Sequence, residues 1–307
     1  MLTFAAAMWI WLALISAVLL GFYDVAKKYA LKSNGIYFVI LAATGFTALF
    51  LCPFLSAGPV SYHVKIAVKA LIVTITWLSG MEALRLLPIT TVSTFKASRP
   101  MFVVLFSIIL FGERLNLWHW LGVATVAVAL WLLGAASGKE GFRFGSGRGF
   151  WALIISMATG VASALWDKYI IKGFVFDGPL SPVYAALPEQ LQVPLFIQSW
   201  TNLYITIILA IIVAVKAIRE GSERERFHWD WSLLVIAVLI TLSDALYFLA
   251  ISQEGSMLSV IALVRRFSIV VTFVTGAIIF KEGKIKGKSV ALAFMIAGIV
   301  LLMVGSL

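Results

Sequence analysis

The sequence predicts an all-α membrane protein with ten transmembrane helices, arranged as two inverted five-helix repeats. Three observations lead to this fold class. The 307 residues are 62% hydrophobic and 12% charged, with a mean hydropathy of +1.03, whereas soluble domains are about half apolar and a quarter charged. The chain also divides into ten apolar segments long enough to cross a bilayer, and its two halves resemble each other.

The apolar segments are separated by turn and charge signals such as "LKSNG", "RLLP", "GERLN" and "KEGKIKGK". Because a span needs about 20 apolar residues, we predict spans at residues 4–26, 36–56, 65–86, 89–111, 117–136, 149–171, 192–218, 231–252, 256–280 and 286–306. No basic residues precede the first apolar run, so it is predicted to be a span rather than a cleaved signal peptide.

The internal similarity appears when each residue n is compared with residue n+140. The matching residues are Trp11, Ile15, Ser16, Lys28, Tyr29 and Lys32 with Trp151, Ile155, Ser156, Lys168, Tyr169 and Lys172. An odd number of spans per repeat would insert the two halves in opposite directions, as is typical of secondary transporters. We expect a first repeat at 1–136, a connecting loop at 137–148 and a second repeat at 149–307.

Four basic residues lie well inside predicted spans, far from the span ends: Lys96, Arg99, Arg265 and Arg266. Each charge at the centre of a span costs roughly 2.5–3.5 kcal/mol on insertion scales, so these residues should face water or partners. In the ninth predicted span, polar residues recur at helical spacing and form one stripe. The members of this stripe are Arg265, Ser268, Thr272 and Thr275.

Only two acidic residues, Glu82 and Asp244, are expected well inside the spans. Four bases against two acids leave two positive charges, which predicts an anionic substrate, because guanidinium groups bind carboxylate or phosphate in a bidentate manner. Either acid could carry a coupling proton. In a purely structural alternative, the acids pair with Arg99 and Arg266. Tyr247 shares a helix face with Asp244 and could bond a ligand or another helix.

Four charged residues near span ends have two interpretations: Asp24, Lys28, Asp167 and Lys168. They could form a gate, or they could pair and extend toward the membrane interface. No metal site is expected, because the histidines are isolated and the single cysteine is Cys52. The sequence likewise shows no nucleotide-binding loop or hydrolytic motif, so neither a cofactor nor an enzymatic activity is expected.

Two segments resemble the EamA-type members of the drug/metabolite transporter superfamily: "SIILFGERLNLWHWLGVATVAVALWLLG" at 107–134 and "GAIIFKEGKIKGKSVALAFMIAGIVLL" at 276–302. In these segments Glu113 and Glu282 follow spans four and nine, where we expect structural roles. The segments "VSTFKASRPMFVVLFS" and "VIALVRRFSIVVTF" are also similar to the triose-phosphate translocator branch. That resemblance implies a phosphate grip by Lys96, Arg265 and Arg266, with Arg-Arg here where the branch has Lys-Arg.

These observations predict a secondary transporter of a small organic anion, with a phosphate-bearing substrate as the narrower expectation. Two alternatives stay open: an exporter of amino acids, amines or drugs with structural basic residues, and a membrane scaffold or sensor without transport. The expected surroundings are the lipid bilayer and a small-molecule substrate, without nucleic acid, as a monomer or homodimer. The expected location is the bacterial cytoplasmic (inner) membrane. Loop charges favour both termini outside, whereas the family resemblance favours both inside.

Overall fold

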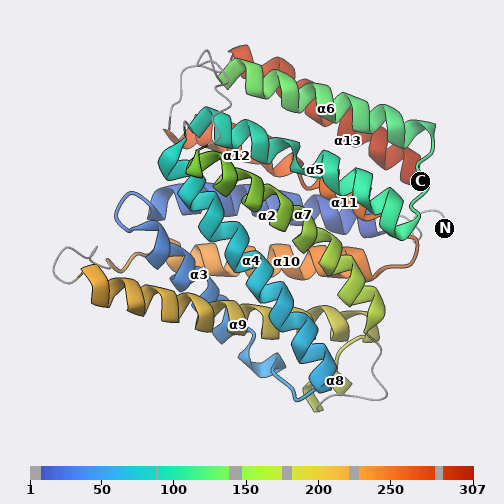
Figure 1. Ribbon diagram of the computed structural model, residues 1–307. Helices are drawn as coiled ribbons and strands as arrows, with labels where there is room; N and C mark the ends of the chain where they lie inside the picture. Colours follow the sequence, from blue (N-terminus) through green and yellow to red (C-terminus); the bar gives the residue numbers. More distant parts are fainter. Residues whose placement is uncertain (1–7, 88, 138–146, 175–181, 221–227, 281–285) are drawn as a thin grey trace.

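The computed structural model describes residues 8–87, 89–137, 147–174, 182–220 and 228–280 together with 286–307, and these form a bundle of helices without a β-strand (Figure 1). The helices are α2 (Met8–Ala30), α3 (Ile36–Phe50), α4 (Val60–Leu86), α5 (Ile89–Phe111), α6 (Leu117–Ser137), α7 (Arg148–Gly173), α8 (Pro182–Ala185), α9 (Glu189–Glu220), α10 (Trp231–Ser252), α11 (Leu258–Val264), α12 (Phe267–Phe280) and α13 (Lys286–Ser306), with a 3₁₀ turn, η1, at Cys52–Phe54.

Seven helical stretches in the described residues are long and apolar enough to cross a membrane. Three shorter apolar helices accompany them, at Ile36–Phe50, Ser98–Phe111 and Leu117–Leu133. The prediction of an all-α membrane protein is therefore confirmed, while the ten-span inverted repeat stays a prediction. Most of the expected connecting loop, residues 138–146, lies outside the described residues.

The second predicted span, 36–56, extends beyond the C-terminal end of the helix that the structure shows. Helix α3 stops at Phe50, and Pro53 lies in the 3₁₀ turn that follows. Proline has no backbone N–H for the helical hydrogen bond and clashes with the preceding turn, so it favours an end of the helix at this point. The third span began too late in the prediction, because α4 starts at Val60 rather than at residue 65. Lys69 is therefore well inside α4 rather than near its beginning.

The ninth predicted span is not one continuous helix. Helix α11 ends at Val264 and α12 begins at Phe267, so the two arginines form the break between them. The Arg266 and Ser268 amides bond three residues back, to Leu263 (2.9 Å) and Arg265 (3.3 Å), in place of the usual four-residue α-helical pattern. The prediction of one helix through Arg265 and Arg266 is wrong, because helical periodicity in a sequence does not show where a helix breaks.

The core is built from both halves of the chain. Its largest buried cluster joins Ile10 of α2, Val104 of α5, Ile170 of α7, Ile251 of α10 and Ile261 of α11. Helices α4 and α7 pack along each other, as do α2 and α10, and α3 packs against α9. The α2–α10 contact includes the buried Ser16 hydroxyl, which donates to the Ser243 carbonyl at 2.7 Å.

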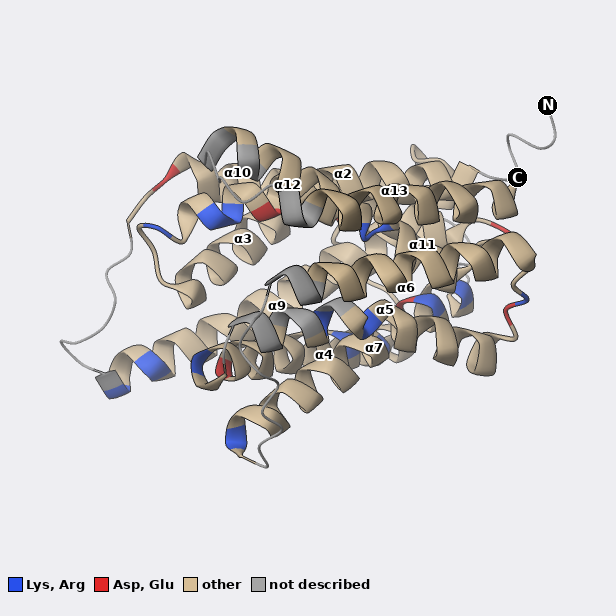
Figure 2. Ribbon diagram, turned by 90° about the horizontal axis from the view of Figure 1, so that it is seen from above, with Lys and Arg blue, Asp and Glu red and all other residues tan. Residues whose placement is uncertain are grey.

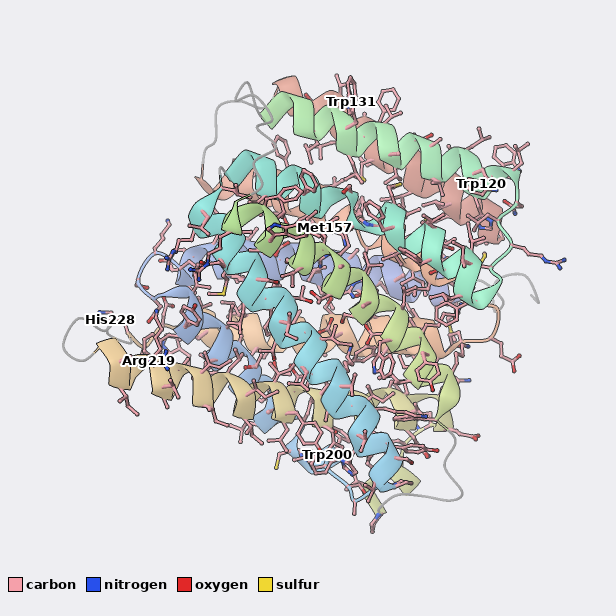
Figure 3. All side chains as sticks on the ribbon, in the orientation of Figure 1. Trp120, Trp131, Met157, Trp200, Arg219 and His228 are labelled. Carbon is pink, nitrogen blue, oxygen red and sulfur yellow. The ribbon has the colours of Figure 1, made fainter. Side chains whose placement is uncertain are left out.

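Helices α6 and α13 lie side by side at one edge of the bundle (Figure 1). Their backbones come close at Gly122 and Gly298, where the Gly122 carbonyl lies 3.2 Å from the position of a Cβ added to Gly298. Small residues allow such close contact between membrane helices. Trp120 and Trp131 of α6 point outward and are 51% and 69% exposed (Figure 3), as expected for a lipid-facing surface.

Replacing Gly298 with Ala is expected to destabilise the α6–α13 contact. The new Cβ would lie 2.9 Å from the Val126 backbone nitrogen, so the helix itself must move. Overpacking of this kind costs about 1–3 kcal/mol. Gly45→Ala is the matched control, because its Cβ would meet only a Thr206 methyl at 3.8 Å. Thermal unfolding in detergent measures both variants, and equal midpoints would contradict the close contact.

Candidate substrate site

The break between α11 and α12 lies beside α5, which packs against α11. Lys96 and Arg99 belong to α5, while Arg265 and Arg266 occupy the break. Arg99 interacts electrostatically with both Lys96 and Arg266, so the four predicted cations form one cluster. Figure 2 shows basic residues within the bundle as well as at its ends. We call Lys96, Arg99, Arg265 and Arg266 the cation cluster.

Helix α5 lacks one backbone hydrogen bond where it carries Lys96 and Arg99. Pro100 lies in its interior and cannot bond the carbonyl four residues earlier, which is that of Lys96. Two glycines on facing helices make room for the α5 cations. A Cβ at Gly80 of α4 would lie 2.8 Å from the Lys96 Nζ, and a Cβ at Gly160 of α7 would lie 2.3 Å from the Arg99 Cζ. Any larger residue at Gly160 would displace the Arg99 guanidinium.

Arg265 already has an anionic partner. Its Nη2 lies 3.1 Å from the Asp244 Oδ1, and its guanidinium carbon lies 4.1 Å from the centre of the Tyr247 ring. The Arg265 side chain is 16% exposed and the Asp244 side chain 33%, so the pair is not fully enclosed. The structure therefore pairs Asp244 with Arg265, whereas the structural alternative had paired it with Arg266.

The other cations lack a carboxylate within ion-pair distance among the described residues. Lys96 has no hydrogen-bond or ion-pair partner there, and Arg99 donates from Nη2 to the Ser156 carbonyl at 3.1 Å. The Nε atoms of Arg99, Arg265 and Arg266 are all buried without a partner in the described structure. Buried guanidinium donors are normally satisfied, so this cluster has unused capacity for an acceptor.

The second acid of the cluster is Asp24, not Glu82. Asp24 interacts electrostatically with Arg265 and Arg266, and with Lys27 on its own helix. Glu82 instead lies 3.0 Å from Arg148, whose side chain is 81% exposed. Glu82 therefore pairs with Arg148 at the start of α7 and not with a residue of the cation cluster. Four cations still face two carboxylates, and Lys27 adds another positive charge beside Asp24.

The polar stripe of the ninth span packs mainly against α2. The Thr272 hydroxyl donates to the Gly21 carbonyl at 3.2 Å, and Ser268 is 5% exposed. A Cβ at Gly21 would lie 2.9 Å from the Ser268 carbonyl, so the helices are in close contact. The stripe thus marks a helix contact next to the cation cluster.

One of the two acids that were expected near span ends, Asp167, is buried. Asp167 is 4% exposed and forms an ion pair with Lys69 of α4, and its Oδ2 accepts from the Tyr247 hydroxyl at 3.3 Å. Lys69 was not among the predicted site residues, because the predicted span began at residue 65 and placed this lysine near its beginning. The available signal was Lys65 and Lys69 at i, i+4, on one face of a helix long and apolar enough to cross a membrane. Lys28 is exposed, in contrast to its repeat counterpart Lys168.

Lys168 and Glu113 form a second buried pair, with 2.6 Å between Nζ and Oε1. The Glu113 carboxylate also accepts from the Leu258 amide (2.6 Å), the Ser259 amide (3.0 Å) and the Ser259 hydroxyl. A residue at the end of α5 thus caps the start of α11 and neutralises a lysine of α7. Its repeat counterpart Glu282 lies outside the described residues.

Together, the apolar helices and the buried charges define an integral, multi-pass membrane protein. Residues 7–135 match the model of the EamA-like transporter family, so the predicted resemblance is confirmed for this part of the chain. This part of the chain is therefore similar to a family of membrane transporters. A crystal structure of a protein has the same fold, with a TM-score of 0.69 and 17% sequence identity over 96% of this chain and 97% of that one. None of the curated proteins matches the sequence.

Proposed function

We propose that the protein is a secondary transporter of a small organic anion, which binds at the cation cluster. The observation that carries this proposal is the set of three buried Nε donors that have no partner among the described residues, in a cluster where four cations face two described carboxylates. A substrate with two negative charges would balance the cluster and supply the missing acceptors. Carboxylate and phosphate groups can each accept two parallel hydrogen bonds from a planar guanidinium, and a phosphate-bearing substrate is the narrower form of the proposal.

The proposed mechanism is alternating access by two inverted repeats of five helices, at 1–136 and 149–307. Equivalent helices have equivalent neighbours: α2 packs on α10 and α7 packs on α4, while α3 packs on α9 and α6 on α13. The repeat-related Ser16 and Ser156 make equivalent bonds, to the Ser243 and Thr76 carbonyls respectively. This correspondence supports an arrangement in which the site lies between the repeats.

The break between α11 and α12 also supports the proposal. Transporters of inverted-repeat design place their substrate sites at discontinuous helices, because half-helix ends direct backbone dipoles toward the ligand. Here the two arginines lie at such a break, opposite the Pro100 segment of α5. The Glu113–Lys168 pair joins the segment after α5 to α7 and to the start of α11, and in the proposed mechanism it would be part of a gate.

Counterflow in proteoliposomes tests the proposal with a panel of phosphorylated, carboxylated and cationic metabolites. Vesicles loaded with one member of the panel should accumulate the same labelled compound only when it is anionic. Thermal unfolding with the same compounds gives an independent measure, because a ligand that binds only the folded protein raises its stability. Counterflow and stabilisation by cations alone would favour an exporter of amines or drugs and would contradict the anion proposal.

A further inference from the structure

Lys69 and Asp167 form a buried ion pair that the substrate site does not need for its charge balance. Each residue is 4% exposed, and they join α4 to α7. These helices already pack along each other, and they are bonded through Ser156 to the Thr76 carbonyl at 2.9 Å and through Thr76 to Thr159 at 2.8 Å. Burying an ion pair often gives no net stability over apolar residues, so helix packing alone does not explain this pair.

The pair is physically connected to the cation cluster through Tyr247. The Tyr247 hydroxyl donates to the Asp167 Oδ2 at 3.3 Å, while the face of its ring lies 4.1 Å from the Arg265 guanidinium carbon. Arg265 in turn binds Asp244. Among the described residues, the charged groups that interact with Lys69 are its partner Asp167 of α7, Asp244 of α10 and Arg265 at the end of α11. Two direct contacts, from Asp167 to Tyr247 and from Tyr247 to Arg265, therefore link the charge of Asp167 to the substrate site.

We propose that the Lys69–Asp167 pair is a proton-binding site that couples proton uptake to anion binding through Tyr247. Asp167 takes one proton on a carboxylate oxygen, and the pair changes from neutral to one net positive charge. That charge favours an anion at the cation cluster, and by linkage a bound anion favours the proton to the same extent. Proton and anion then cross together. This inference rests on the proposed anion transport and adds its coupling ion.

The first test detects the proton itself and needs no substrate. Infrared difference spectra of the purified protein between alkaline and acidic pH should contain the carbonyl band of a buried protonated carboxyl group. The band should be lost in the double variant Lys69→Gln with Asp167→Asn, which leaves no unpaired buried charge. It should remain in Glu254→Gln, which removes an exposed acid from the α10–α11 turn. A band that persists in the double variant, or that is absent from the native protein, overturns the proposal.

The second test measures the coupling, with sulfate as the probe because it does not titrate near neutral pH. Sulfate should raise the unfolding temperature of the native protein more at pH 6 than at pH 8. The double variant should lose this pH dependence, and Tyr247→Phe should reduce it while keeping the infrared band. A double variant with the native pH dependence would show a purely structural pair and overturn the coupling. If sulfate has no effect at either pH, the anion proposal fails for this probe, and the infrared result alone decides whether Asp167 binds a proton.

Discussion

Replacing Arg266 or Lys96 with Ala is expected to weaken binding of an anionic substrate by one to two orders of magnitude. These two cations have no carboxylate within ion-pair distance among the described residues. A hydrogen bond to a charged group contributes about 1.5–3 kcal/mol, and every 1.4 kcal/mol is a tenfold change in affinity. Arg266→Lys should recover only part of the loss, because an ammonium keeps the charge but not the planar fork.

The measurement is the dissociation constant of an anion identified by counterflow, determined for protein that elutes as a single species in detergent. Arg219→Ala is the matched control, because Arg219 is exposed on the last turn of α9, at the edge of the bundle (Figure 3). Native affinity in both Arg266→Ala and Lys96→Ala would mean that the cations are structural and the anion proposal is wrong.

Arg265 should behave differently from these two residues because it is already paired. Arg265→Ala removes a cation but also leaves the Asp244 carboxylate, 33% exposed, without its partner. Restoring neutrality with Asp244→Asn in the same chain should therefore recover part of the lost binding. The same Asp244→Asn change should not help Arg266→Ala. This contrast distinguishes the paired cation of the cluster from the unpaired ones.

The largest loss of stability is expected for Glu113→Gln. The native carboxylate accepts from Lys168, from two backbone amides of α11 and from the Ser259 hydroxyl. Glutamine offers one acceptor oxygen and leaves Lys168 buried without a counter-charge. Breaking a buried pair in this way costs about 3–5 kcal/mol. We expect a correspondingly lower unfolding midpoint in detergent.

Two further variants establish the cause of that loss. Lys168→Met in the Glu113→Gln background removes the unpaired cation and should recover part of the stability. Glu254→Gln changes an exposed carboxylate in the turn just before α11 and should leave the midpoint unchanged. An unfolding midpoint of Glu113→Gln equal to that of the native protein would show that neither the cap on α11 nor the ion pair with Lys168 contributes to stability.

Much of the fold could be predicted because apolar length and turn residues are local properties. The predicted spans at 89–111, 231–252 and 286–306 coincide with α5, α10 and α13. The errors occurred where a local signal was ambiguous. Pro53 ended α3 early, and the apolar run at 256–280 gave no sign that the helix would break at its two arginines.

The basic residues of the candidate site could be predicted from the sequence, but their ion-pair partners could not. An apolar span makes any interior charge conspicuous, so Lys96, Arg99, Arg265 and Arg266 could be named from the sequence. Their partners could not, because pairing depends on which helices are neighbours and how they are rotated. Asp24 took the place expected for Glu82, and Asp167 proved to be buried against Lys69.

By itself, the sequence determined that the chain is an all-helical membrane protein and that its spans carry more positive than negative charge. Both follow from composition and helical length, since a bilayer selects long apolar helices and makes interior charge costly. Only the tertiary structure decided which cations have partners and which lack them. It also joined Lys69, Asp167 and Tyr247, which lie on three different helices. Contacts between distant residues depend on helix packing, which no local pattern encodes.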